Sequence, residues 1–193
     1  MITPPLYWNG VHFPSQGGLP VKISNTEFQE CCCGTVFDAD FIVITYNFVA
    51  AGGIDLDTRT SITAPITRGP LGWCKSNDDA PLYWGDDNTG YGVESCYIDL
   101  THADLVSQTY VEVLCQAWWY GTKQSGDMSL DIKAYLGGTI SQVGYGFVNT
   151  GGTETANISS AYNVSLHSSA CVITPDTVAT VRYNMTSGIL TFT

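Results

Sequence analysis

Acidic side chains in two separate segments are the residues of this chain best suited to chemistry, and that chemistry is cation binding. Asp55 and Asp57 are separated by one residue, so a strand places both carboxylates on one face, about 7 Å apart. Asp86, Asp87 and Asn88 lie in a Gly-rich segment, where positive φ angles let oxygen atoms converge. Calcium takes six to eight oxygen ligands from flexible segments. The two segments therefore predict a calcium site if the fold brings them together.

A second interpretation stays open, because Asp and Asn are also common turn residues. Residues 85–94 do not have the spacing of an EF-hand, since the alternating ligands and the Glu at the twelfth position are missing. Crowded carboxylates repel each other when no cation is present. A bound cation would remove that repulsion and stabilise the folded state by binding only to it.

Three segments resemble the TerD family in type and order. They are Gly53-Ile54-Asp55-Leu56-Asp57, the loop 85–92 (GDDNTGYG) and the strand-like segment 94–100 (ESCYIDL). The resemblance covers about residues 37–136. It implies a β-sandwich that binds calcium in these loops and is linked to tellurite and stress resistance.

The resemblance also implies a set of ligands. Carried over to this chain, they are Asp55, Asp57, Asp86, Asn88 and Glu94, and Asp87 joins them on its chemistry alone. Asp87 is inserted between the Asp and Asn that the family shows, and the extra Gly and Asp residues after Gly92 are missing. Fewer acidic ligands imply weaker binding or a single ion. Asp99, within the predicted strand, is interpreted as structural.

Short strands must position these side chains. Phe41–Val49 is apolar on both faces and predicts a central strand. Ile54–Thr63 alternates strictly, with Asp55, Asp57, Arg59 and Ser61 on one face. Further strands are predicted at 81–84, 94–100, 110–120, 157–166, 178–183 and 189–192, with a hairpin of 128–136 and 139–147 around Gly137-Gly138 and loops at 64–80 and 149–155.

Roughly nine or ten short strands with frequent turns predict an all-β fold, a two-sheet antiparallel β-sandwich with an extended N-terminal arm. The arm is residues 1–30, rich in Pro, Gly and aromatic residues, and the sandwich domain is residues 31–193. The arm is expected to pack on its own domain or on a neighbouring subunit.

The net charge of −11, with only 7 Lys and Arg, argues against nucleic acid and anionic membranes as partners. No apolar stretch approaches the roughly 18 residues of a membrane span, and the N-terminus has no secretory signal pattern.

Seven cysteines are present, and their spacing matches no zinc motif. Cys96 and Cys115 lie in apolar strand-like segments, where a free thiol behaves as a small hydrophobic group. Cys31-Cys32-Cys33 could not converge on one metal ion without a bend, because neighbouring side chains of a strand point to opposite faces. Reduced thiols are the expectation.

No catalytic motif is found, so the chain is not expected to be an enzyme. His12, His102 and His167 lie in no nucleophile or zinc motif, and the chain has no phosphate-binding loop. The Trp118-Trp119-Tyr120 segment suggests either a platform for a sugar or core packing, and core packing is favoured.

The sequence therefore predicts a non-catalytic calcium-binding β-sandwich that acts as a structural component of a large assembly, most plausibly a bacteriophage virion, with other subunits as partners through the arm. The alternatives are a cytoplasmic TerD-type stress-response scaffold and a carbohydrate-binding module, which would take a glycan as its ligand.

Overall fold

A computed structural model describes residues 7–8, 11–12, 39–48, 55–90, 92–121, 128–168, 171 and 174–193. The chain divides into two compact units, Met1–Thr35 and Val36–Thr193. In the first unit, β1 (Tyr7–Trp8) pairs antiparallel with β2 (Val11–His12). The rest of the predicted arm and the Cys31-Cys32-Cys33 segment lie outside the described residues.

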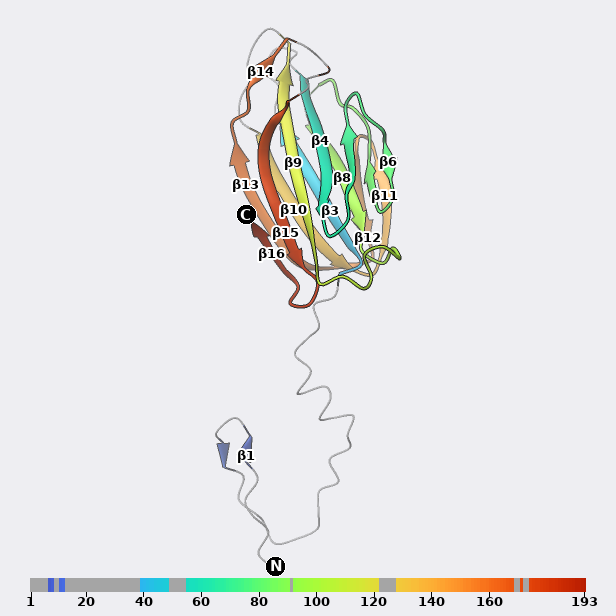
Figure 1. Ribbon diagram of the computed structural model, residues 1–193, viewed down its shortest axis with the longest axis vertical. Helices are drawn as coiled ribbons and strands as arrows, with labels where there is room; N and C mark the ends of the chain where they lie inside the picture. Colours follow the sequence, from blue (N-terminus) through green and yellow to red (C-terminus); the bar gives the residue numbers. More distant parts are fainter. Residues whose placement is uncertain are drawn as a thin grey trace, which may run out of the picture. The chain divides into compact units, whose positions relative to one another are not determined.

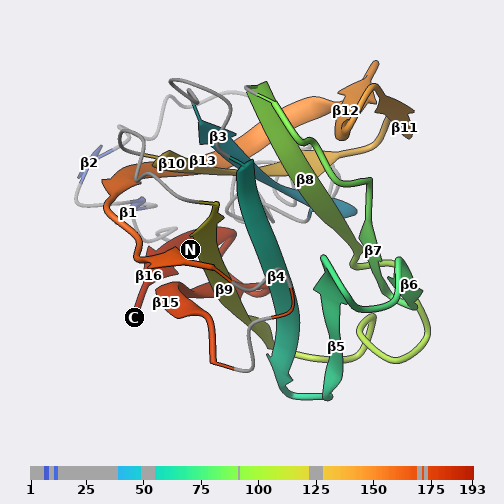
Figure 2. The same cartoon turned by 90° about the horizontal axis from the view of Figure 1, so that it is seen from above.

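The second unit consists of two six-stranded sheets packed face to face, which confirms the predicted all-β sandwich (Figures 1 and 2). Sheet I has the order β13 (Thr153–Tyr162), β10 (Met128–Leu136), β3 (Phe41–Phe48), β8 (Gly92–Asp99), β7 (Leu82–Trp84) and β6 (Asp78–Asp79). Sheet II has the order β16 (Ile189–Phe192), β15 (Asp176–Asn184), β9 (Tyr110–Tyr120), β4 (Asp55–Ala64) and β5 (Arg68–Gly72), with β14 (Leu166–His167) also paired to β9. The pairings are antiparallel except that of β14 with β9.

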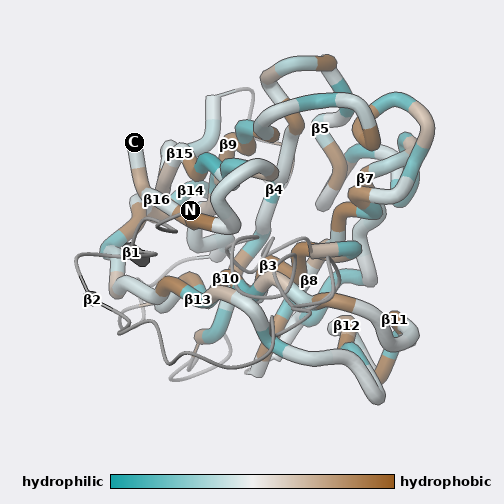
Figure 3. The backbone as a smooth tube through the Cα atoms, turned by 90° about the horizontal axis from the view of Figure 1, so that it is seen from below, coloured by the Kyte–Doolittle hydropathy of each residue, from teal (hydrophilic) through white to brown (hydrophobic). Residues whose placement is uncertain are grey.

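The core forms because strands of both sheets turn alternate side chains inward. On β3, Ile42, Ile44 and Tyr46 are buried in the core, and β3 lies between β10 and β8, as a central strand should. On β4 the alternation places Leu56 and Ile62 in the core. Hydrophobic stretches accordingly recur along the strands of both layers (Figure 3).

A few polar and aromatic contacts hold the two sheets in register. The Tyr46 hydroxyl on sheet I lies 2.8 Å from Thr60 Oγ1 on sheet II, and Cys96 Sγ donates to the same Thr60 oxygen at 3.2 Å. The rings of Phe48 and Trp119 meet edge to face, with centroids 6.1 Å apart. Buried hydrogen bonds are directional, so these contacts fix which side chains face each other across the core.

Cys96 and Cys115 are free and buried, which confirms the prediction made for them. Burial raises the pKa of both thiols well above the ordinary value, because a thiolate is poorly solvated in the core.

The expectation that the thiols are all reduced is wrong. Cys74 and Cys171 form a disulfide across a sequence separation of 97 positions. Their Cα atoms lie 5.7 Å apart, within the range of disulfides. Because the fold brings the two residues together from distant parts of the chain, no local sequence pattern predicts this pairing. Closing a chain loop of this length stabilises a fold by about 4–5 kcal/mol in the chain-entropy account.

The predicted hairpin around Gly137-Gly138 is also wrong. β10 pairs with β3 and β13, and the chain after Gly138 forms a separate hairpin of β11 (Thr139–Val143) and β12 (Gly146–Thr150). The turn of that hairpin contains Gly144, whose φ is 61°, and a second turn at Gly151-Gly152 leads into β13. β12 and β13 therefore occupy most of the segment predicted as the loop 149–155, and the predicted loop 64–80 contains β5 and β6.

Among the described residues, the structure contains no helix long and apolar enough to cross a membrane.

Replacing Gly72 by Ala should destabilise the fold strongly. A Cβ at this position would lie 2.0 Å from the backbone oxygen of Thr58, and the φ of 130° disfavours any side chain. We expect the free energy of unfolding to fall by at least about 2 kcal/mol in chemical denaturation. Gly144→Ala is the matched control, because its Cβ would meet nothing within 4 Å, so only the backbone cost of about 1 kcal/mol remains. Equal effects of the two substitutions would contradict this account.

Candidate metal centre

Three aspartates from two segments meet at one edge of sheet II. Asp55 and Asp57 begin β4, and Asp87 comes from the loop between β7 and β8. One carboxylate oxygen of each lies within 4.8 Å of the others. β5 pairs with β4 only from Arg59 onward, so the first residues of β4 are left free to meet the loop.

Asp57 is the most unusual of the three, because its side chain is fully buried, with 0% exposure. Neither of its carboxylate oxygens has a hydrogen-bond partner in the described part of the chain, and both are inaccessible to solvent. Asp55 Oδ1 and Asp87 Oδ1 are inaccessible and unpartnered in the same way. Burying a carboxylate without a partner costs several kcal/mol, so four such oxygens in one place form a group that could hold a metal ion.

Burial, together with neighbouring carboxylates, raises the pKa of every carboxyl in the cluster. Burial and then the negative charge of Asp87 raise the pKa of Asp55 to about 6. Burial, followed by the charges of Asp55 and Asp87, raises the pKa of Asp57 to about 8. Burial and then the neighbouring Asp86 raise the pKa of Asp87. Asp57, with a pKa of about 8, is therefore the carboxyl of the cluster that favours its protonated form at neutral pH.

Two neighbours on the same face of sheet II counteract this rise only in part. The Trp118 indole is paired across the strands with Asp57 and lowers its pKa, although the indole nitrogen makes no hydrogen bond of standard geometry. The Arg59 guanidinium has a smaller effect in the same direction. It lies 4.8 Å from the centre of the Trp118 ring, and its Nε donates to the backbone oxygen of Trp73 at 3.3 Å. Arg59 is thus held close to the cluster by contacts with other groups.

Hard oxygen ligands of this kind fit a divalent cation such as Ca²⁺ or Mg²⁺. The cluster formed by Asp55, Asp57 and Asp87 could hold a metal ion, and the fit rests on its four unpartnered oxygens.

The other three predicted ligands lie nearby and shape the loop. Glu94 is fully buried on β8 and accepts hydrogen bonds from Thr58 Oγ1 at 2.5 Å and from the Asn88 backbone N–H at 3.1 Å. The Asn88 side chain accepts from the Gly90 N–H and donates to the backbone oxygen of Val93, near the start of β8. Asp86 is exposed and accepts from the N–H of Asp87.

Glu94 also ties the loop to β4. Burial raises its pKa well above the ordinary value, while the bonds from Thr58 and Asn88 oppose that rise. Because Thr58 lies on sheet II and Glu94 on sheet I, this contact joins the sheets directly beside the aspartates. Asp99 accepts hydrogen bonds from the N–H and hydroxyl of Thr101, in keeping with its interpretation as a structural residue.

Sequence reasoning did not identify the roles of Thr58, Arg59 and Trp118 around the cluster. The alternation of β4 indicated the face of each residue, but it could not indicate whether the polar face is covered. Asp57 and Arg59 are buried, and so are Trp118 and Trp119. The proposed sugar platform is therefore wrong for the two tryptophans, and of that segment only Tyr120 is exposed.

Comparison with the profiles of known protein families, with curated proteins and with solved structures finds no match to this chain. The resemblance to the TerD family stays a prediction from the sequence.

The metal-free protein should lose stability as the pH rises. The pKa values of Asp55 and Asp57 are raised to about 6 and 8 in the folded state, so between pH 4 and pH 8 the folded chain binds more protons than the unfolded chain. Stability conferred by those protons is complete below the unfolded pKa and is lost as the pH rises through the folded values. Thermal unfolding in excess EDTA from pH 4.5 to 8.5 should show a falling melting temperature. A melting temperature that rises over this whole range would contradict the charge crowding.

Proposed function

We propose that this protein is a non-catalytic calcium-binding β-sandwich in which the ion joins the start of β4 to the loop between β7 and β8. The observation that carries the proposal is the fully buried Asp57, with both carboxylate oxygens unpartnered and two further carboxylates beside it. A divalent cation would compensate three negative charges that the fold otherwise leaves close together.

Calcium suits this site better than magnesium. Magnesium keeps several of its waters and binds through one or two carboxylates, whereas calcium accepts many oxygen ligands in flexible geometry. Four carboxylate oxygens here are inaccessible to solvent, and three of the four belong to two residues of one strand. A site whose oxygens are inaccessible to solvent favours calcium, because calcium gives up its bound water molecules more readily than magnesium does.

The enclosure of the oxygens also favours a stabilising role. An ion held among atoms that solvent does not reach has little room for a substrate, whereas it would fix the start of β4 against the β7–β8 loop. The TerD resemblance implies the same chemistry at Asp55, Asp57 and the 85–94 segment, and it supports the proposal independently of the geometry.

Calcium should raise the melting temperature of the chelator-treated protein and bind with measurable heat. At a free concentration of 100 times the dissociation constant, one site adds about 2.7 kcal/mol of stability. Terbium, which replaces calcium at oxygen sites, should luminesce when Trp118 is excited, because this indole is the cross-strand partner of Asp57. Isothermal titration calorimetry, melting curves and terbium luminescence measure these effects.

Asp57→Asn is the decisive variant. It keeps the shape of the side chain but removes the buried charge, so the variant should be at least as stable as the native protein in EDTA and should gain nothing from calcium. Asp86→Asn is the matched control, because Asp86 is exposed and lies outside the cluster. Calcium binding that survives Asp57→Asn unchanged, or that is lost in Asp86→Asn, would place the ion elsewhere.

We further propose that the sandwich is a subunit of a larger assembly, such as a virion. The support is an exposed apolar patch on the β11–β12 hairpin, formed by Val143, Tyr145 and Val148 with exposures of 61%, 45% and 43%. The hairpin carries hydrophobic stretches in Figure 3. Contiguous exposed apolar residues mark protein contact surfaces.

Sedimentation velocity tests the simplest form of this idea, assembly with further copies of the chain. The calcium-loaded protein should sediment faster as its concentration rises, and the substitutions V143S, Y145S and V148S together should weaken that effect. Ile189→Ser, on sheet II, is an exposed apolar control. A monomer at every concentration would exclude self-assembly through this patch.

A further inference from the structure

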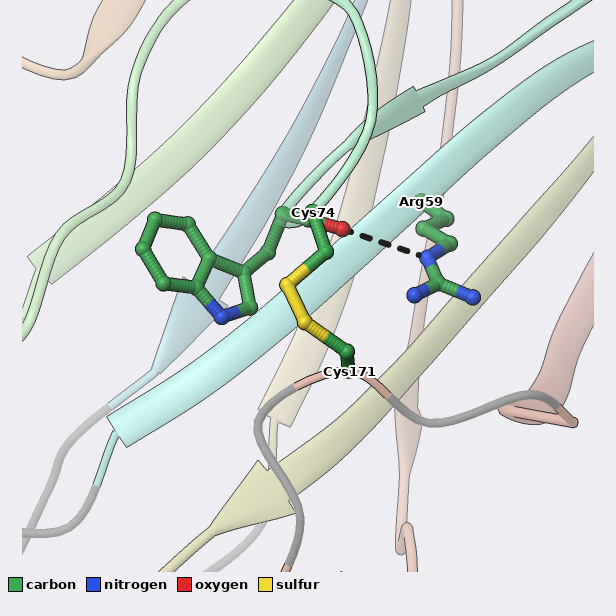
Figure 4. The surroundings of a disulfide bond; sticks show 4 residues. Arg59, Cys74 and Cys171 are labelled. Carbon is green, nitrogen blue, oxygen red and sulfur yellow. Dashed lines mark hydrogen bonds between the residues drawn. A yellow bond between two sulfur atoms is a disulfide. The ribbon is translucent and has the colours of Figure 1, made fainter.

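The Cys74–Cys171 disulfide joins two segments that are hydrogen-bonded to residues adjoining the aspartate cluster. Cys74 lies in the turn that follows β5, and Cys171 follows β14 in the chain. Both flanking segments are attached to sheet II close to Asp57, one on each side of β4. The bond therefore bridges β4 on its outer side (Figure 4).

On one side, the turn is attached to the residues that directly follow Asp57. The backbone N–H of Trp73 donates to the Thr58 oxygen at 3.2 Å, and the Trp73 oxygen accepts from Arg59 Nε at 3.3 Å. Figure 4 shows this second bond beside Cys74. The turn thus supplies one of the contacts that hold the Arg59 guanidinium, and Arg59 interacts electrostatically with Asp57.

On the other side, the chain before Cys171 is attached to β9 beside the cluster. His167 pairs with Tyr120, and Tyr120 pairs with Asp55 in the next strand. The Trp119 N–H donates to the Ser165 oxygen at 2.9 Å, and the Gly121 N–H donates to the His167 oxygen at 3.2 Å. The disulfide thus connects the neighbours of Asp55 to the neighbours of Asp57.

The turn does not hold its shape by local preference. Cys74 has a φ of 59°, in the left-handed region that residues with a side chain rarely adopt. Such a conformation persists where surrounding contacts impose it. In this turn, the disulfide is a covalent contact that does so.

We propose that the Cys74–Cys171 disulfide is a redox latch on the calcium site: oxidation holds the turn against β4 in the arrangement that binds the ion, and reduction weakens binding. The proposal rests on the proposed calcium function and adds a regulation to it. Groups that position metal ligands commonly change metal affinity by about 10–100-fold when they are removed. We expect a loss of about tenfold on reduction.

The reaction is an ordinary thiol–disulfide exchange with a dithiol as the reductant. A thiolate of the dithiol attacks one sulfur of the Cys74–Cys171 bond, which forms a mixed disulfide and releases the other cysteine. The second thiol of the reagent then attacks the mixed disulfide, releases the remaining cysteine and closes the reagent to a cyclic disulfide. The two electrons break the bond between the Cys74 and Cys171 sulfurs, and both leave as thiols after taking up protons.

The coupling must be reciprocal. If oxidation tightens calcium binding tenfold, calcium must make the disulfide tenfold harder to reduce at equilibrium, because both changes belong to one thermodynamic cycle. This second consequence is independent of any optical signal from the metal.

The test compares terbium and calcium affinities of the full-length oxidised protein, the same protein in dithiothreitol, and the variant C74S with C171S. The reduced protein and the double variant should both bind about tenfold more weakly. Dithiothreitol should leave the affinity of the double variant unchanged, which separates this disulfide from the other five cysteines. Near-UV circular dichroism establishes that each sample is folded at the temperature of the titration. Should the double variant fail to fold, reduction titrations with and without calcium give the same coupling from the native chain alone.

The outcomes separate the two proposals. If the oxidised protein binds neither ion, the calcium function fails. If the oxidised protein binds calcium, but reduction does not change the calcium affinity and calcium does not change the ease of reduction, the calcium function stands and the latch is excluded.

Discussion

The central physical constraint in this structure is the buried charge of Asp57. A carboxylate removed from water is tolerated only when a cation, a proton or hydrogen-bond donors take the place of the lost solvation. Arg59 and Trp118 lie close but do not form a hydrogen bond with the two oxygens, and the neighbouring Asp55 and Asp87 make the charge harder to hold. With the pKa of Asp57 raised to about 8, a proton takes this role at neutral pH. A metal ion held by the three aspartates could take the place of that proton.

The two faces of β4 explain how the sandwich produces this arrangement. One face turns Leu56, Thr58 and Thr60 toward sheet I, and the hydroxyls of the two threonines bond with Glu94 and Tyr46 across the core. The other face carries Asp55, Asp57 and Arg59 against surrounding segments of the chain. Register across the core therefore fixes the height at which the aspartates meet the β7–β8 loop, since Glu94 belongs to the strand that this loop enters.

The sequence predicts the parts of this structure that depend on local pattern and misses those that depend on distant contacts. Alternation identifies β4, and the apolar segment that becomes β3 identifies a central strand. It cannot tell that the polar face of β4 is covered, because the cover comes from segments far along the chain. Gly137-Gly138 is typical of a hairpin turn. However, β10 is paired on both edges, with β3 and with β13, so the chain after Gly138 forms a separate hairpin.

The candidate site shows the same division. Two acidic segments suggested a shared cation, and three of the six predicted ligands meet, while Glu94, Asn88 and Asp86 serve the loop through hydrogen bonds. All six residues carry oxygen atoms that could bind a cation. Only the structure distinguishes the aspartates with unpartnered oxygens from residues such as Glu94, whose oxygens already accept hydrogen bonds. The Cys74–Cys171 pairing lies beyond any such reading, because seven cysteines permit many pairings and spacing ranks none of them.

The placement of the disulfide and the acidic cluster beside one stretch of β4 has a consequence for how stability is distributed. The hydrophobic core fixes the middle of the sandwich without directional preference, since apolar contact depends on area rather than orientation. At the start of β4 the strand pairing on one side is absent: β5 has not yet begun to pair, and a loop and a turn take its place. Such an edge opens locally at lower free energy than the rest of a sheet. The disulfide and a cation held by the aspartates would both act on the segments that replace the missing strand, so each would limit the opening that weakens the other. Coupling between them follows from that shared element and needs no communication through the core.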